Sequence, residues 1–319
     1  MNHRESIDMG GEPRRSDTAT QPALAHESRR GRRTWSGAAV RERCAVWGVL
    51  NVTPDSFSDG GRHLALDDAW ARADRMREEG ADVIDVGGES SRPPGRTYGA
   101  GAAKVGADEE LRRVLPVVER LVAAGAAVSV DTVKGEVARR VLAAGAGAIN
   151  DVSMGADPAL LEAVAAHGAD LVLMHTRDGG RVDGRTTAYD DLVAEVRTEL
   201  EGAVERAVAR GVDRARIWID PGIGFAKTPA QSAALLGNLD ALVATGYPVL
   251  VGASRKSFIA RTMAAAGAPE PSPDARLGGS LAAVTAAALA GCAAVRVHDV
   301  RDSVQAARVA EAMAKGRVA

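Results

Sequence analysis

Polar residues follow several short apolar runs of this sequence, at the point where each run ends. An isolated aspartate or asparagine in such a place is usually a turn former or a helix N-cap, but here the pattern recurs along the chain. The residues are Asn51, Glu89, Asp131, Asn150, Asp151, His175, Asp220, Arg255, Lys256, Arg296 and His298. Carboxylates and an amide gathered in one place can hydrogen-bond a flat, nitrogen-rich heterocycle. The cationic side chains suit a phosphate or a carboxylate.

The apolar runs themselves predict the fold. Eight of them are spaced along the chain, at 44–50, 81–87, 126–131, 145–150, 169–175, 216–220, 248–253 and 293–298. The stretches between them carry apolar residues every three or four positions and end at glycine, which is typical of amphipathic helices. Alternating strands and helices predict an α/β fold with a parallel sheet. Eight such units favour a closed (β/α)₈ TIM barrel, although a doubly wound open sheet has the same rhythm.

A barrel would bring the polar residues together, because the carboxyl ends of its strands and the loops after them form the active face. Three of those loops, in DVGGES, DPGIGFAKT and GASRKSF, contain glycine next to small residues. Such loops can present backbone N–H groups to an anion. We therefore expect a two-sided mouth, with a heterocycle on one side and a phosphate or carboxylate on the other.

Length and composition set the domain organisation. A TIM barrel needs roughly 250 residues, so the 319-residue chain suits one barrel domain, which we assign to residues 35–319. Residues 1–34 are rich in Arg, Ser, Glu, Gly and Pro with few large apolar side chains. They cannot bury enough surface to offset the entropy of ordering, and we predict a disordered N-terminal tail.

Charge and hydropathy exclude some partners and compartments. The formal net charge is -2 and the basic residues are dispersed, so no nucleic-acid partner is expected. No apolar run approaches the ~20 residues of a membrane helix, and no secretory signal is evident. Cys44 and Cys292 lie inside apolar runs, where free buried thiols of a reducing compartment are expected. These features favour a cytoplasmic protein without a membrane partner.

From residue 44 to about 315 the chain resembles the dihydropteroate synthase family. The resemblance rests on NVTPDSFSDGG at 51–61, DVGGESSRPPG at 85–95, SVDT at 129–132, IND at 149–151, LMH at 173–175, DPGIGFAKT at 220–228, GASRKSF at 252–258 and RVHDV at 296–300. The first motif is very specific and the shorter ones are weak alone, but all occur in the family's order. The resemblance implies a pterin-binding TIM barrel, commonly a homodimer, that acts in folate biosynthesis. Such a transferase joins 6-hydroxymethyl-7,8-dihydropterin pyrophosphate to 4-aminobenzoate and releases pyrophosphate.

The resemblance also implies a role for individual residues. The pterin would be held by Asp131, Asn150, Met174, Asp220, Phe225 and Lys256. Pyrophosphate would contact Arg92, Arg296 and His298, with Mg²⁺ bridging it to Asn51. The 4-aminobenzoate pocket would comprise Phe57, Pro93 and Ser257. Catalysis would depend on Asn51, Asp55, Arg92 and Lys256, with Asp55 stabilising a cation and helping to organise Mg²⁺.

This assignment is chemically coherent. Loss of pyrophosphate from a pterin-CH₂ group leaves a delocalised cation, which an arylamine can capture. The enzyme would stabilise separating charge with Mg²⁺ and cationic side chains. It would not need an activated serine or cysteine nucleophile.

The sequence departs from the family pattern in three places. The loop over residues 92–107 is longer than usual and glycine-rich, and we expect a mobile segment near the barrel mouth or a tolerated insertion. Ser91 and Ala226 replace the usual Thr and Gly, changes between small residues that we expect to be harmless. The stretch after LMH lacks the family's Gly-x-Pro.

Three other functions compete with the synthase. A folate-dependent methyltransferase could share the pterin-binding residues, but it should not need SRKS and RVHDV. A paralogue that binds pterin without turnover should have lost some of the charged residues, which are all present. A phosphate-handling aldolase would use a Schiff-base lysine, and Lys256 beside Arg255 is a poor place for a desolvated amine.

Overall fold

The computed structural model describes residues 43–52, 61–89, 105–180 and 183–316, with the side chains of residues 61–65 left out. The predicted disordered tail at 1–34 lies outside the described residues. So does most of the predicted mobile loop, because 90–104 are not described.

Eight parallel strands form the centre of the structure. They are β1 (Ala45–Asn51), β2 (Val83–Gly87), β3 (Val128–Asp131), β4 (Ala148–Asp151), β5 (Asp170–Met174), β6 (Ile217–Asp220), β7 (Leu250–Val251) and β8 (Ala294–Val297). Their hydrogen-bonded order is β6-β5-β4-β3-β2-β1-β8-β7. A parallel bridge between Ile219 and Val249 joins the two ends of that order. The predicted closed barrel is therefore confirmed, and the open doubly wound sheet is excluded.

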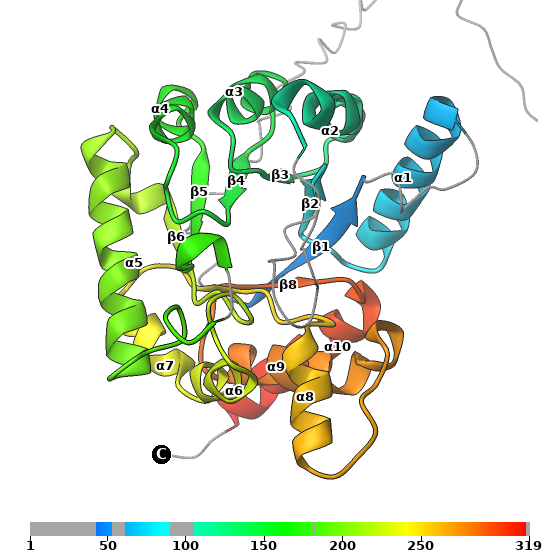
Figure 1. The fold of residues 1–319 in the computed structure, drawn as a ribbon. Helices are drawn as coiled ribbons and strands as arrows, with labels where there is room; N and C mark the ends of the chain where they lie inside the picture. Colours follow the sequence, from blue (N-terminus) through cyan, green and yellow to red (C-terminus); the bar gives the residue numbers. More distant parts are fainter. Residues whose placement is uncertain (1–42, 53–60, 90–104, 181–182, 317–319) are drawn as a thin grey trace, which may run out of the picture. The chain divides into compact units, whose positions relative to one another are not determined.

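Helices surround the strands, as Figure 1 shows. They are α1 (Gly61–Glu78), α2 (Ala107–Ala123), α3 (Gly135–Ala143), α4 (Pro158–His167), α5 (Leu192–Ala209), α6 (Pro229–Leu236), α7 (Leu239–Val243), α8 (Ser257–Ala265), α9 (Leu277–Leu289) and α10 (Val300–Lys315). Short 3₁₀ turns lie at Asp178–Gly180, Arg214–Arg216 and Pro273–Ala275. No helix of the described residues is long and apolar enough to cross a membrane.

The larger core lies between the strands and the helices. Helix α2 illustrates how the sequence builds it, because Leu111, Val114, Val118 and Leu121 are buried at helical spacing. Its acidic first turn also complements the helix dipole. Cys44 and Cys292 belong to this core and are free thiols, as expected.

A second, smaller core fills the floor of the barrel interior. Its buried members are Ala45, Trp47, Val83, Ala148, Val172, Trp218, Leu250 and Ala294. The rings of Trp47 and Trp218 lie in this core with centroids 5.7 Å apart. Because strand side chains alternate between two faces, the interior positions two residues further along several strands carry the polar groups. The apolar floor therefore supports a polar layer at the carboxyl ends of the strands.

Candidate active site

Strand register brings several predicted site residues to one level of the barrel. Asn51 pairs with Gly87 on β2, Gly87 with Asp131 on β3, and Asp131 with Asn150 on β4. Further round, Met174 on β5 pairs with Asp220 on β6. Met174, Asp131, Asn150 and Asp220 are all buried. The structure thus gathers the predicted pterin residues at the strand ends, inside the barrel.

Arg296 on β8 links two carboxylates of this layer. Its Nε donates to Asp85 Oδ2 at 2.5 Å, and one terminal nitrogen donates to Asp131 Oδ2 at 2.8 Å. Burial opposes the charge of Arg296, but the two carboxylates keep its pKa above the ordinary value. Arg296 therefore stays cationic.

Asn150 and Asp85 retain unused hydrogen-bonding capacity beside Asp131. Burial, with Asp85 nearby, raises the pKa of Asp131 to about 7 although Arg296 opposes the shift. Asn150 donates weakly to Asp85 at 3.5 Å. Its own Oδ1 and Asp85 Oδ1 are buried and accept no hydrogen bond from any described residue. Buried polar atoms normally have partners, so these oxygens are suited to accept N–H groups of a ligand.

Asp220, at the end of β6, and Lys256, after β7, form another part of the barrel mouth, away from Asp131 and Asn150 on β3 and β4. Asp220 Oδ1 accepts from the backbone N–H of Gly222 at 2.7 Å, and burial raises the pKa of the carboxyl while Lys256 opposes the shift. Lys256 Nζ donates to the Ile223 carbonyl at 2.6 Å and lies 4.8 Å from the centroid of the Phe225 ring. A carboxylate, a cation and an aromatic face therefore converge on one space. This combination suits a planar, polar heterocycle.

The structure corrects one argument about Lys256. Its amine is desolvated, and burial lowers its pKa to about 8 although Asp220 opposes the shift. The expectation that this is a poor place for a desolvated amine is wrong. The reason is that the chain after β7 turns Lys256 toward the loop after β6. The hydrogen bond from Lys256 Nζ to the Ile223 carbonyl weighs against Schiff-base chemistry.

Two other cations differ from expectation. Arg255 is not a free anion donor, because its guanidinium bonds Asp299 at 3.0 Å and Asp274 at 2.8 Å. His298 is not cationic at neutral pH, because burial, reinforced by Arg296, lowers its pKa to about 4. Its ring Nδ1 lies 3.1 Å from the Ser254 hydroxyl. The neutral imidazole can still form a hydrogen bond to an anion, but it adds no charge.

The remaining predicted residues lie at the rim or outside the described part. Asn51 is exposed at the end of β1, and Ser257 begins α8 and is partly exposed. The positions not described are Asp55, Phe57, Arg92 and Pro93. Their predicted roles stay predictions.

Ala226 is less neutral than expected. Its φ of 50° lies in the left-handed region, where glycine has no steric penalty, and the residue is fully buried. The usual glycine would avoid a strain of roughly 1 kcal/mol at this position. The replacement therefore has a backbone cost that side-chain size alone does not reveal, and its harmlessness stays a prediction.

Asp85 was not assigned a role in the sequence analysis. It lies inside β2, two residues before the strand end, and is fully buried. Period-two alternation would have placed it beside Gly87 on the interior face. Attention to strand ends alone missed it.

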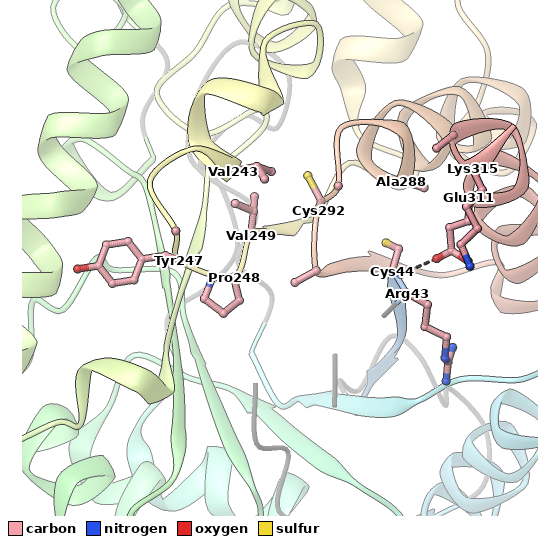
Figure 2. Close-up of a pocket in the computed structure, with 14 residues that line it drawn as sticks. Arg43, Cys44, Val243, Tyr247, Pro248, Val249, Ala288, Cys292, Glu311 and Lys315 are labelled. Carbon is pink, nitrogen blue, oxygen red and sulfur yellow. Dashed lines mark hydrogen bonds between the residues drawn. The ribbon is translucent and has the colours of Figure 1, made fainter. Parts of the chain in front are cut away.

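A cavity of about 380 Å³ lies elsewhere, at the amino ends of β1, β7 and β8 (Figure 2). Cys44, Pro248, Val249 and Ala293 line it, and each immediately precedes or adjoins the start of a strand. Active faces of TIM barrels lie at the carboxyl ends of the strands. This cavity is therefore at the wrong end of the barrel for the site.

The Arg296 cluster generates a stability prediction. Replacing Asp85 with Asn should lower the free energy of unfolding by about 3 kcal/mol, because one partner of a buried charge pair is removed. Glu205→Gln is the control, since it breaks a pair with Arg214 in which the side chains are 63% and 46% exposed. It should cost less than about 1 kcal/mol. Urea denaturation measures both, and equal losses would contradict the buried pair.

Comparisons with known proteins identify the family of this chain. The family model described as pterin binding enzyme matches residues 47–298. The dihydropteroate synthase of Mycobacterium leprae is 49% identical over 266 residues, which cover 83% of this chain and 91% of that protein.

Two solved structures from Xanthomonas albilineans have the same fold. A dihydropteroate synthase with 4-aminobenzoic acid has a TM-score of 0.77 at 44% identity, covering 87% of this chain and 95% of the other. A second, in complex with 7,8-dihydropteroate, has a TM-score of 0.74 at 42% identity, covering 87% and 96%. Sequence and fold thus agree, and the chain belongs to the pterin-binding enzymes, in the family of the dihydropteroate synthases.

Proposed function

We propose that this chain catalyses the reaction of its family. It joins 6-hydroxymethyl-7,8-dihydropterin pyrophosphate to 4-aminobenzoate and forms 7,8-dihydropteroate and pyrophosphate. The observation that carries the proposal is the buried layer of Asp85, Asp131, Asn150 and Asp220 in the barrel mouth, in which Asp85 Oδ1 and Asn150 Oδ1 are open acceptors. A ligand that cannot fill these acceptors would leave them unpaired, which gives strong discrimination.

The described residues divide the work. Asp220 and Asn150 accept N–H groups of the pterin, while Lys256 donates to an acceptor atom of the ring and Phe225 packs on its face. Arg296 stabilises negative charge that develops on the departing pyrophosphate. We propose that Met174, buried at the end of β5, covers the other face of the pterin.

Asn51 would hold Mg²⁺ together with pyrophosphate oxygens. The fit depends on oxygen donors, because Mg²⁺ usually takes one or two protein oxygens and completes its shell with water and phosphate. Asn51 offers an exposed amide at the end of β1. No group of three His, Cys, Asp or Glu residues suited to a metal occurs in the described ranges. A bound Mg²⁺ would neutralise charge on the leaving group.

The proposed activity is tested by a pyrophosphate-release assay on the full chain. Release should require both substrates and should stop when a chelator removes divalent cations. Each substrate is omitted in turn as a control. Release with the pterin pyrophosphate alone would indicate a hydrolase, and no release with both substrates would contradict the proposal.

Lys256 generates a pH prediction. Its pKa of about 8 lies below the ordinary value, so the ammonium that donates to the pterin is present below pH 8 and is lost as the pH rises through 8. Affinity for 6-hydroxymethylpterin should then fall by up to about tenfold per pH unit above 8. Lys256→Met should bind more weakly at pH 7 and show no such fall. The control is Lys315→Met, at an exposed position. Titration calorimetry checks this, and a fall that persists in Lys256→Met would refute the role.

We further propose a cytoplasmic homodimer. The buried free thiols of Cys44 and Cys292 suit a reducing compartment. Recovery of the protein from a secreted or membrane fraction would contradict the cytoplasmic location.

The dimer is proposed from an apolar pair on α10. Val309 and Met313 are one turn apart and each is 55% exposed. Exposed apolar pairs of this kind favour an interface.

Light scattering should give twice the 33.0 kDa chain mass. Met313→Glu should shift the protein toward 33.0 kDa, whereas Met263→Glu, on α8, should not. A wild-type mass of 33.0 kDa would contradict the dimer.

A further inference from the structure

The loop that joins β6 to α6 has an irregular backbone that side chains must satisfy. Gly222, Gly224 and Ala226 have φ values of 66°, 81° and 50°. Because every second residue has a positive φ, the loop cannot form the regular backbone hydrogen bonds of a helix or strand. Its buried carbonyls therefore require other donors. Three side chains supply these donors, one from within the loop and two from outside it. The loop lies at the carboxyl end of β6 (Figure 1).

Each donor holds a different carbonyl. Lys256 Nζ donates to the Ile223 carbonyl from within the mouth. Lys227 Nζ donates to the Phe225 carbonyl at 3.0 Å, and the Tyr189 hydroxyl donates to the Ala226 carbonyl at 3.0 Å. The loop is thus held from two directions.

Lys227 is the unusual member of this set. It is only 2% exposed, and its Nζ lies 2.8 Å from His175 Nδ1. Burial lowers its pKa to about 7 although Asp220 opposes the shift. A buried amine of this kind is costly unless it is hydrogen-bonded. The proposed chemistry gives it no direct task.

His175 has one tautomer that fits its neighbours. Burial lowers its pKa to about 4, so the ring is neutral at pH 7. Burial opposes ionisation of Glu199, but His175 and Arg177 lower the pKa of Glu199 to about 2, so it is a carboxylate. Glu199 lies 3.0 Å from His175 Nε2. That nitrogen must carry the proton, which leaves Nδ1 as an acceptor for Lys227.

The far end of this chain of bonds is firmly anchored. Arg177 donates from Nε to both oxygens of Glu199, at 3.0 and 3.1 Å, and its guanidinium lies 3.9 Å from the Tyr189 ring centroid. The near end is packed tightly as well. A Cβ on Gly222 would lie 2.0 Å from the His175 carbonyl oxygen, so loop and strand end leave no room for another residue there.

We propose that Lys227 is a positioning residue of the pterin pocket, acting through the chain Lys227–His175–Glu199. It holds the Phe225 carbonyl, so that the Phe225 ring stays beside Lys256 in the mouth. The inference rests on the proposed function, because it assumes that Phe225 and Asp220 contact the pterin. A merely structural role would lower stability and weaken every ligand alike.

Lys227→Met tests this through two ligands measured by calorimetry on the full chain. The Kd for 6-hydroxymethylpterin should rise about tenfold, which corresponds to 1.4 kcal/mol. The Kd for inorganic pyrophosphate, which does not use the Phe225 face, should change less than about twofold. Asp170→Asn is the matched control. Asp170 is a buried carboxylate at the opposite end of β5, paired with Arg216 at 3.3 Å. The Asp170→Asn variant should have a lower Tm and an unchanged Kd for 6-hydroxymethylpterin.

His175 variants keep the test decisive if Lys227→Met fails to fold. Gln in place of His175 can accept from Lys227 and donate to Glu199, so His175→Gln should bind pterin within about threefold of wild type. His175→Leu can do neither and should lose about tenfold. Lys227→Met combined with His175→Leu should bind no worse than either single variant, because both remove the same chain of bonds.

Several results would overturn the inference. They are a pterin Kd within twofold of wild type for Lys227→Met, equal losses of pterin and pyrophosphate affinity, or His175→Gln binding no better than His175→Leu. A wild-type protein that binds no pterin would overturn the proposed pocket itself and the inference with it.

Discussion

The structure depends on the mutual compensation of charges buried at one end of the barrel. Asp85, Asp131 and Asp220 share this space with Arg296 and Lys256. An isolated buried ion is costly, so these carboxylates and cations stabilise one another through opposite charge. The strand register places them at fixed positions, and the tryptophan pair packs in the core beneath them. The barrel therefore provides polar partners at fixed positions, which is a condition for strong electrostatic selection of a ligand.

Buried cations also hold the loop after β6 in place. Its carbonyls turn toward lysines on two sides, Lys256 in the mouth and Lys227 behind it. Each amine has a pKa below the ordinary lysine value because of its burial. The loop consequently joins Lys256 in the mouth to the network around Glu199. Backbone strain at Ala226 is tolerated because hydrogen bonds determine the surrounding conformation.

The sequence predicted the barrel and most of the gathered residues for a simple reason. Strand periodicity gives the elements, and the carboxyl ends of parallel strands must meet, so Asp131, Asn150 and Asp220 could be placed without coordinates. Tertiary partners could not be predicted in this way. Arg255 pairs with carboxylates that are distant in the sequence, and burial keeps His298 neutral. Site assignments in the loops at 53–60 and 90–104 depended on the family resemblance alone, and these residues lie outside the part that the structure describes.

The most direct test of this account is a crystal structure of the chain bound to a dihydropterin. The account predicts that the ring lies in the barrel mouth. Its N–H groups should be within hydrogen-bonding distance of Asn150 Oδ1 and the Asp220 carboxylate, with Phe225 against one face. A dihydropterin bound outside the mouth, for example in the cavity beside Pro248 at the amino ends of the strands, would contradict the account. So would a ring in the mouth that leaves the Asn150 oxygen unpaired.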